Sequence, residues 1–323
     1  MIDQSEEQVQ IRQQKLQRLR EAGVDPYPSR YYRTHTKQEA ATLWLKVEEA
    51  QGRDARSEPI SVAGRIVGMR AMGKATFLDL QDGTGRIQAL LRQNTLGPSY
   101  GLLKDLDLGD FLGVEGPLFR TRAGEVTVEA QTWTLLSKAL RPPPEKWHGL
   151  RDVEQRYRQR EADLFSNEEV RRRFILRSRI VDGMRRFLGG YGFIEVETPI
   201  LLPVAAGAMA YPFVTHHNAL DRTLYLRIAT ELHLKRCIIG GLDRVFEIGR
   251  VFRNEGLDAR HNPEFTTLES YQAYADYSDV MEMVEKMIAN LALELLGTTA
   301  VPWNGQVMEL KPPWKRLTLR GAL

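Results

Sequence analysis

Arginine, histidine, aromatic and acidic side chains crowd the stretch VFRNEGLDARHNPEFTTLESY, which begins at Val251. Arginine binds phosphate well because its planar guanidinium donates paired hydrogen bonds and stays charged. Phe265 offers a ring on which a base can stack, and the carboxylates of Glu231 and Glu269 can pair with an amine. These residue types predict a site for a nucleotide phosphate and a small cationic molecule. From the pattern alone, a surface hairpin whose charges pair with one another remains an alternative.

Two runs of alternating side chains must position these groups. In DRVFEIGRVFRNE, period-two alternation places Arg253 and Glu255 on one face. In EFTTLESYQAYA, Phe265, Glu269 and Tyr271 share a face. If the runs pair antiparallel, one sheet surface presents all five side chains. The connection from Gly256 to Glu264 has nine residues, which is long for a hairpin loop and typical of a binding loop.

Helices and strand-like runs also flank this pair of strands in the second half of the chain. We expect a helix between Ser166 and Gly189, and a strand in FIEVETPIL. The run YLRIATELHLKRCIIGG predicts a short strand entering a helix that Gly240 ends. A last helix is expected over residues 278–296. Helices beside antiparallel strands predict an α+β fold.

Residues 60–140 show short alternating segments punctuated by glycine, after an expected helix over residues 5–22. Five such strands predict a small β-barrel of the oligonucleotide-binding (OB) type. In ATFLDLQD, Leu78 and Leu80 face one way, so Phe77 faces the other way as an exposed aromatic side chain. The expected parts of the chain are a helical extension (1–55), an OB-fold domain (56–140), a proline-rich linker (141–165) and an α+β domain (166–323).

Composition limits the class of protein. The net charge is +3, and the single cysteine, Cys237, excludes an intrachain disulfide, which suits a reducing compartment. We found no apolar run long enough to span a membrane and no signal-peptide pattern, so a cytoplasmic location is expected. Arginines outnumber acids between Arg151 and Arg186. That local basicity indicates either solvated helix faces or contact with a polyanion such as RNA.

Several motifs carry a resemblance to a known family. YGFIEVETPIL resembles the first signature motif of class II aminoacyl-tRNA synthetases, and FRNEG followed by RHNPEF resembles the second. LRIATELHLKR, THHNALD, KALRPPPEKWHGL and YRQR are similar, in order and spacing, to the lysyl-tRNA synthetase family. The resemblance implies an antiparallel catalytic sheet behind an OB-fold anticodon domain. It also implies ATP-dependent attachment of lysine to tRNA(Lys) through a lysyl-adenylate.

The matched motifs also imply roles for individual residues. Arg253 is the expected catalytic residue, because it would bridge the lysine carboxylate and the α-phosphate. The residues expected to bind ATP are Arg253, Glu255, Arg260, His261, Asn262 and Phe265. Those expected to bind L-lysine are Gly207, Glu231, Arg253, Glu269 and Tyr271. Those expected to bind the anticodon are Arg70, Phe77 and Gln88.

The chain also departs from the family pattern. It ends at Leu323, before a third, glycine-rich motif with an arginine for ATP, so an incomplete catalytic sheet flanked by helices is expected. The Mg²⁺ ligands would lie beyond Leu323, and no metal site is expected within this chain. We therefore expect little activity from these residues alone, with a non-catalytic RNA-binding or regulatory fragment as the alternative. The family also implies a homodimer that meets through the first motif.

Overall fold

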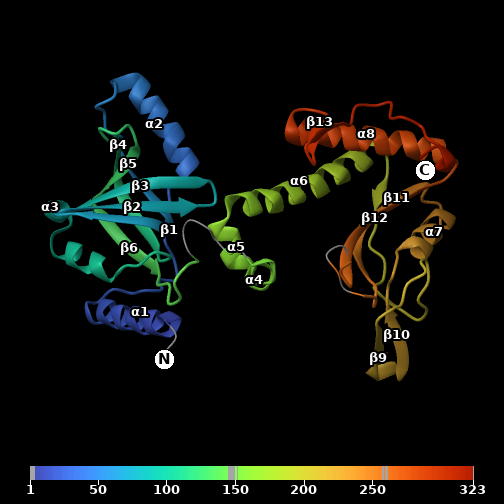
Figure 1. The fold of residues 1–323 in the computed structure, drawn as a ribbon, viewed down its shortest axis with the longest axis horizontal. Helices are drawn as coiled ribbons and strands as arrows, with labels where there is room; N and C mark the ends of the chain where they lie inside the picture. The colour runs from blue at the N-terminus through green and yellow to red at the C-terminus, as the bar shows by residue number, and fades with distance from the viewer. Residues whose placement is uncertain (1–3, 145–149, 151, 257, 259–260, 323) are drawn as a thin grey trace. The chain divides into compact units, whose positions relative to one another are not determined.

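The computed structural model describes residues 4–144, 150, 152–256, 258 and 261–322 (Figure 1). The chain forms two compact units, Met1–Asn167 and Glu168–Leu323. We propose a finer division into an extension, an OB-fold domain, a linker and an α+β domain.

A six-stranded β-barrel forms the centre of the first unit. The strands are β1 (Pro59–Met72), β2 (Ala75–Asp82), β3 (Gly85–Arg92), β4 (Phe111–Arg120), β5 (Val126–Ala130) and β6 (Thr132–Ser137). They follow the order β1-β2-β3-β5-β4-β6, and pairing of β1 with β4 closes the barrel. The fifth expected run is divided at Gln131, whose backbone nitrogen donates to Glu115 O at 2.7 Å. The predicted OB-fold and the α+β class are confirmed.

Alternation along the strands builds the barrel core. Leu78 and Leu80 of β2 are buried with leucines of β4 and β6, while Phe77, the residue before Leu78, is only half-buried on the outer face. Helices α1 (Gln4–Glu21) and α2 (Lys37–Gln51) pack on the barrel through Leu19 and Trp44 (Figure 1). A short helix α3 (Gln93–Leu96) and a 3₁₀ helix η1 (Gly97–Asp105) connect β3 to β4.

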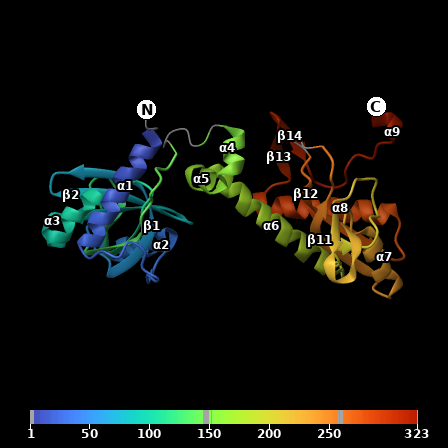
Figure 2. The same cartoon turned by 90° about the horizontal axis from the view of Figure 1, so that it is seen from below.

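Part of the expected linker is helical. Helices α4 (Val153–Arg158) and α5 (Arg160–Ser166) follow the proline-rich segment (Figure 2). The buried carboxylate of Asp163 accepts hydrogen bonds from Arg156 at 3.1 Å and from Arg160 at 2.9 Å. The pair with Arg156 joins α4 to α5, whereas the pair with Arg160 lies within α5, and the charge pattern of the arginine-rich segment did not reveal either pair in advance.

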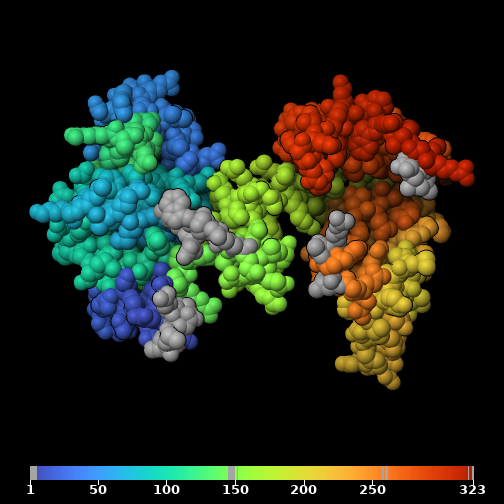
Figure 3. Space-filling model, viewed as in Figure 1, coloured from blue at the N-terminus to red at the C-terminus, as the bar shows by residue number. Residues whose placement is uncertain are grey.

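The second unit combines helices with short sheets. Its helices are α6 (Glu168–Gly190), η2 (Asn218–Leu220), α7 (Glu231–Ile239), α8 (Tyr277–Leu296) and α9 (Leu319–Ala322). Its strands are β7 (Ile194–Glu195), β8 (Leu201–Leu202), β9 (Val214–His217), β10 (Arg222–Leu226), β11 (Arg244–Phe252), β12 (Glu264–Gln272), β13 (Ala300–Trp303) and β14 (Gln306–Glu309). Strands order as β12-β11-β7, β8-β10-β9 and β13-β14. The β9–β10 hairpin projects from the rest of the unit (Figure 3).

The core of the second unit lies on one face of β11 and β12. Phe246, Ile248 and Leu268 of these strands pack with Leu188 of α6 and Met287 of α8. Because neighbouring residues of a strand point to opposite faces, the odd-numbered residues of β11 and β12 face away from this core. Helix α7 packs against the same two strands.

Candidate active site and nucleic-acid interface

The register of β11 and β12 brings the predicted residues onto one face. The two strands pair antiparallel, with Val251 opposite Phe265 and Glu247 opposite Glu269. Directly opposite residues of an antiparallel pair point to the same side of the sheet. The predicted pairing is confirmed, and the strand places Phe265, Glu269 and Tyr271 on the face away from the core.

Arg253 lies just after β11 and over Phe265. Its backbone nitrogen donates to Pro263 O at 2.8 Å, which closes the loop between the strands at its base. Its guanidinium carbon is 5.2 Å from the centroid of the Phe265 ring. The structure therefore brings together the cation that could hold a phosphate and the ring that could stack on a base.

The remaining residues expected to bind ATP lie on the loop. Glu255, His261 and Asn262 are exposed, and Arg260 lies outside the described residues. The ring of His261 lies 2.8 Å from a carboxylate oxygen of Asp258. β11 ends at Phe252, so strand alternation does not reach Glu255. The register of β11 and β12 therefore does not fix the side of the sheet on which Glu255 lies.

An acidic cluster lies at the other end of the same face. The Tyr271 hydroxyl is 3.4 Å from one oxygen of Glu269, whose other oxygen accepts from the backbone nitrogen of Thr230 at 3.1 Å. Gly207 has a φ of +96°, and a Cβ there would lie 3.3 Å from the Glu231 Cβ. Only glycine readily combines this backbone conformation with such a close approach. The structure thus brings Gly207, Glu231, Glu269 and Tyr271 together.

The electrostatics of this cluster favour a cation. Burial, followed by the negative charges of Glu269 and Glu231, raises the pKa of Tyr271 to about 12. The phenol therefore stays protonated at neutral pH and can donate a hydrogen bond. The Oγ1 atoms of Thr230 and Thr267 are buried without a hydrogen-bond partner among the described residues. Carboxylates with uncommitted hydroxyls beside them suit an ammonium group, which has three hydrogen atoms to donate.

Arg227 and Glu247 form a buried ion pair that the sequence analysis missed. Their charged atoms approach to 2.5 Å, and both side chains are about 95% buried or more. Arg227 Nε also donates to Arg250 O at 2.8 Å, and Thr198 donates to the second oxygen of Glu247 at 2.6 Å. A Cβ on Gly249 would lie 2.3 Å from Arg227 Nη2, so the guanidinium lies across β11. A glutamate inside the apolar run VFEIGRVF is the sequence signal that could have revealed this pair.

The predicted anticodon residues lie on the outer face of the barrel. Arg70 is opposite Phe77 in the β1–β2 register, and its guanidinium is 3.3 Å from Asp79. Gln88 donates to Glu125 at 2.5 Å and accepts from Thr127 at 2.9 Å. A cavity of about 420 Å³ is lined by Arg70, Asp79, Arg86, Gln88, Glu125 and neighbouring residues. Glu125 and Asp79 were not predicted and contribute acceptors to this face.

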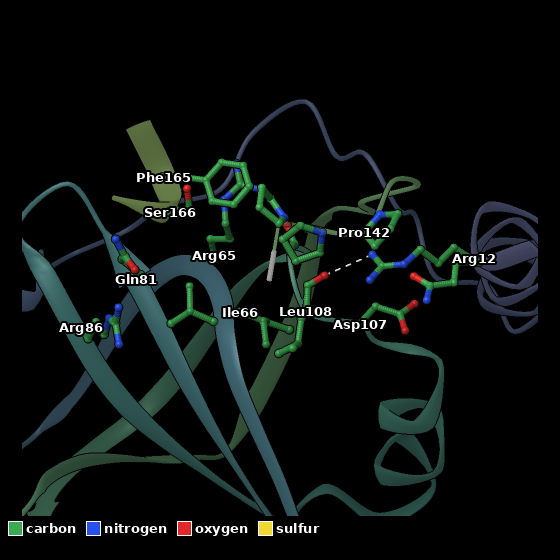
Figure 4. Close-up of a pocket in the computed structure, with 15 residues that line it drawn as sticks. Arg12, Arg65, Ile66, Gln81, Arg86, Asp107, Leu108, Pro142, Phe165 and Ser166 are labelled. Carbon is green, nitrogen blue, oxygen red and sulfur yellow. Dashed lines mark hydrogen bonds between the residues drawn. The ribbon is translucent and has the colours of Figure 1, made fainter. Parts of the chain in front are cut away.

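A second cavity, of about 430 Å³, lies elsewhere in the first unit (Figure 4). Arg65 lies there between the rings of Phe111 and Phe165, at 4.4 and 4.3 Å from their centroids. Arg12 donates to Leu108 O at 3.1 Å and Ala139 O at 2.9 Å. Among the described residues that line this cavity, none is a predicted site residue. Arg12 and Arg65 already have partners in the fold.

The described residues contain neither a candidate metal cluster nor a candidate membrane span. Within the described ranges, no group of three or more His, Cys, Asp or Glu side chains could hold a metal ion. In the same residues, no helix has the length and apolar character needed to cross a bilayer.

Comparisons with known proteins agree with both units. Residues 152–323 match the family described as tRNA synthetases class II (D, K and N), and residues 60–136 match the OB-fold nucleic acid binding domain. A lysine–tRNA ligase of Dehalococcoides mccartyi strain 195 is 52% identical over 311 residues, covering 96% of this chain and 62% of the relative. The lysine–tRNA ligase of Pelotomaculum thermopropionicum is 52% identical over 314 residues, covering 97% of this chain and 60% of the relative. The lysine–tRNA ligase of Staphylococcus haemolyticus is 49% identical over 326 residues, covering 100% of this chain and 66% of the relative. The chain thus spans about 60–66% of the length of these relatives.

Proposed function

Because the chain belongs to the class II tRNA synthetases of the D, K and N group, we propose that it serves the ATP-dependent attachment of lysine to tRNA(Lys). One observation carries this proposal. The face of β11 and β12 that points away from the core holds an arginine over a phenyl ring at one end and an acidic cluster at the other. Relatives about 50% identical to this chain are named lysine–tRNA ligase, which supports lysine as the amino acid.

The arginine end of the face is the proposed nucleotide site. Phe265 stacks on the adenine, and Arg253 lies between the lysine carboxylate and the α-phosphate. Glu255 reads the adenine amino group, as the matched motif implies. The outer phosphates are assigned to loop residues by the same match: Arg260, His261 and Asn262. The contact between Arg253 and Phe265 supports the first two assignments.

The acidic end of the face is the proposed lysine site. Gly207 and Glu231 receive the α-amino group, while Glu269 and Tyr271 receive the side-chain ammonium. The close approach of Gly207 to Glu231 and the pairing of Tyr271 with Glu269 support this division. A buried ammonium needs such acceptors, since an unpaired charge in a protein interior is costly.

The proposed reaction has two transfers. A lysine carboxylate oxygen attacks the α-phosphorus of ATP, the bond to the β-phosphate breaks, and pyrophosphate leaves with the electron pair. A ribose hydroxyl of the tRNA then attacks the carbonyl carbon of the lysyl-adenylate and loses its proton, and AMP leaves with the electron pair of its bond to that carbon. Arg253 offsets the negative charge that accumulates where two anions meet in the first step.

The family expectation also includes Mg²⁺ with the ATP. The described residues supply no group of three or more side chains that could hold such an ion. The steps above use only side chains of this chain.

Selective binding of lysine tests the proposed amino acid site. We expect L-lysine to bind the purified chain at least about 100-fold more tightly than L-norleucine, measured by titration calorimetry. Norleucine lacks the side-chain ammonium, so it would leave the acceptors on Glu269 and Tyr271 unpaired. Glu269→Gln is expected to reduce this selectivity. Equal binding of the two amino acids by the unmodified chain would refute the lysine site and favour the non-catalytic RNA-binding alternative.

The outer face of the barrel is the proposed anticodon interface. Phe77 stacks on an anticodon base, while Arg70 and Gln88 donate hydrogen bonds to base edges. Single-stranded RNA is read in this way, by stacking and by contacts to unpaired bases. The match of residues 60–136 to an OB-fold nucleic acid binding domain supports this role.

Removal of the Phe77 ring should weaken RNA binding. We expect Phe77→Ala to weaken binding of the tRNA(Lys) anticodon stem-loop by about 1–3 kcal/mol, because stacking of one base is lost. Fluorescence anisotropy at fixed salt measures the change, since salt alone alters such affinities. Tyr32→Ala is the control, because Tyr32 is an exposed aromatic residue in contact with Arg30. If both variants bind like the unmodified protein, Phe77 is not the stacking residue.

A homodimer and a cytoplasmic location complete the proposal. Apolar side chains of the first-motif region are exposed in the isolated chain: Ile175, Ile194, Ile200 and Leu201. Burial of such side chains against a second copy would remove apolar surface from water.

A further inference from the structure

The ammonium group of Lys235 occupies the acidic cluster of the proposed lysine site. Lys235 lies one turn after Glu231 on α7, and its Nζ is 2.5 Å from Glu231 Oε1. The same Nζ is 6.0 Å from the centroid of the Tyr271 ring. Lys235 thus contacts two of the residues proposed to hold the amines of the substrate.

This contact differs from an ordinary surface ion pair. Lys286 and Glu282 form an equivalent pair at 3.1 Å on α8, with side chains 49% and 63% exposed. Lys235 is similarly exposed, at 52%, but Glu231 is only 31% exposed because it packs against Gly207. The carboxylate of Glu231 is therefore less accessible to solvent, and Lys235 holds the position that a ligand amine would need.

We propose that Lys235 is an affinity-determining residue of the lysine site, whose ammonium occupies Glu231 in the empty site and leaves when the α-amino group of the substrate binds. The inference rests on the proposed function, because it takes Glu231 as the acceptor of that group. A ligand amine that binds Glu231 Oε1 must replace the existing ion pair and then lies near a displaced like charge. Both effects lower affinity for ligands that use Glu231.

Lys235→Met tests this role. Methionine keeps an unbranched side chain and a good helix propensity but carries no charge. We expect L-lysine to bind Lys235→Met roughly 3- to 10-fold more tightly than it binds the unmodified chain, given the usual size of helix ion pairs and like-charge repulsion. Titration calorimetry at low salt measures the dissociation constants, since salt screens both effects.

A second ligand separates displacement from a general change of the site. 6-Aminohexanoate has the carboxylate and the terminal amine of lysine but lacks the α-amino group. It does not need Glu231, so its affinity should gain less from Lys235→Met than that of L-lysine. Lys286→Met is the matched control, because it removes an equivalent ion pair on α8 and should leave both affinities unchanged.

The outcomes separate the inference from the function on which it rests. If the unmodified chain binds L-lysine and Lys235→Met binds it equally or more weakly, the displacement proposal is wrong. Equal gains for L-lysine and 6-aminohexanoate would also overturn it. If neither the unmodified chain nor Lys235→Met binds L-lysine, the proposed lysine site itself fails, and the inference fails with it.

Discussion

Arg227→Met is expected to lower the free energy of unfolding of the second unit by about 3–5 kcal/mol, because it leaves the buried carboxylate of Glu247 without its cation. The guanidinium also donates to Arg250 O and to the backbone and hydroxyl oxygens of Thr198. The substitution would remove the hydrogen-bond donor of all three oxygens at once. Hydrogen exchange of the β11 amides measures the loss within this unit, apart from the unfolding of the barrel.

A double variant distinguishes the missing charge from the missing contacts. Arg227→Met with Glu247→Met replaces the ion pair by an apolar pair, which in other proteins is often neutral or stabilising. Most of the lost stability should therefore return, although the hydrogen bonds of Arg227 remain absent. A loss below about 1 kcal/mol in the single variant would contradict the expected destabilisation by a buried, uncompensated charge.

Arg253→Ala is expected to weaken binding of a non-hydrolysable lysyl-adenylate analogue by about 100-fold, or about 2.7 kcal/mol. Arg253 is the one proposed residue that contacts both halves of this molecule, and hydrogen bonds to charged groups are among the strongest in proteins. Its side chain is only half-buried, so the fold should tolerate the change. Titration calorimetry against the analogue measures the effect.

Arg253→Lys is the companion variant. Lysine keeps the positive charge but cannot form the planar, bidentate contact of a guanidinium, nor stack as well over Phe265. Its affinity should fall between those of the alanine variant and the unmodified protein. RNA binding by the barrel should be unaffected by either change. If Arg253→Ala binds the analogue within about threefold of the unmodified chain, Arg253 is not the bridging residue.

Local patterns predicted the elements that carry the site. The helix after Ser166, the helix ended by Gly240 and the last helix correspond to α6, α7 and α8. The two alternating runs are β11 and β12, paired antiparallel as expected. Phe265 and Glu269 share a face because successive side chains of a strand point to opposite sides of the sheet, so residues four apart point to the same side. In the barrel the same rule separated Phe77 from Leu78 and Leu80.

The alternation of side chains did not predict where a strand ends or where a run divides into two strands. The pattern extended the first run to Glu255, but β11 ends at Phe252. From there the backbone follows the loop, which the hydrogen bond from Arg253 to Pro263 closes. The last barrel run read as one strand, but the contact of Gln131 with β4 divides it into β5 and β6. The ends of a strand depend on its pairing partners, and these partners lie elsewhere in the chain, outside the run whose pattern is read.

The sequence by itself determined the faces of the paired strands, the helices α1, α6, α7 and α8 and the motif residues, because these follow from periodicity and residue type over short distances. Only the tertiary structure placed Gly207 against Glu231, Arg227 on Glu247 and Lys235 over Tyr271. These partners are separated by 20 to 36 residues along the chain. Contacts of that kind depend on how whole elements pack and on which buried charges find a partner, and neither is written in a local pattern.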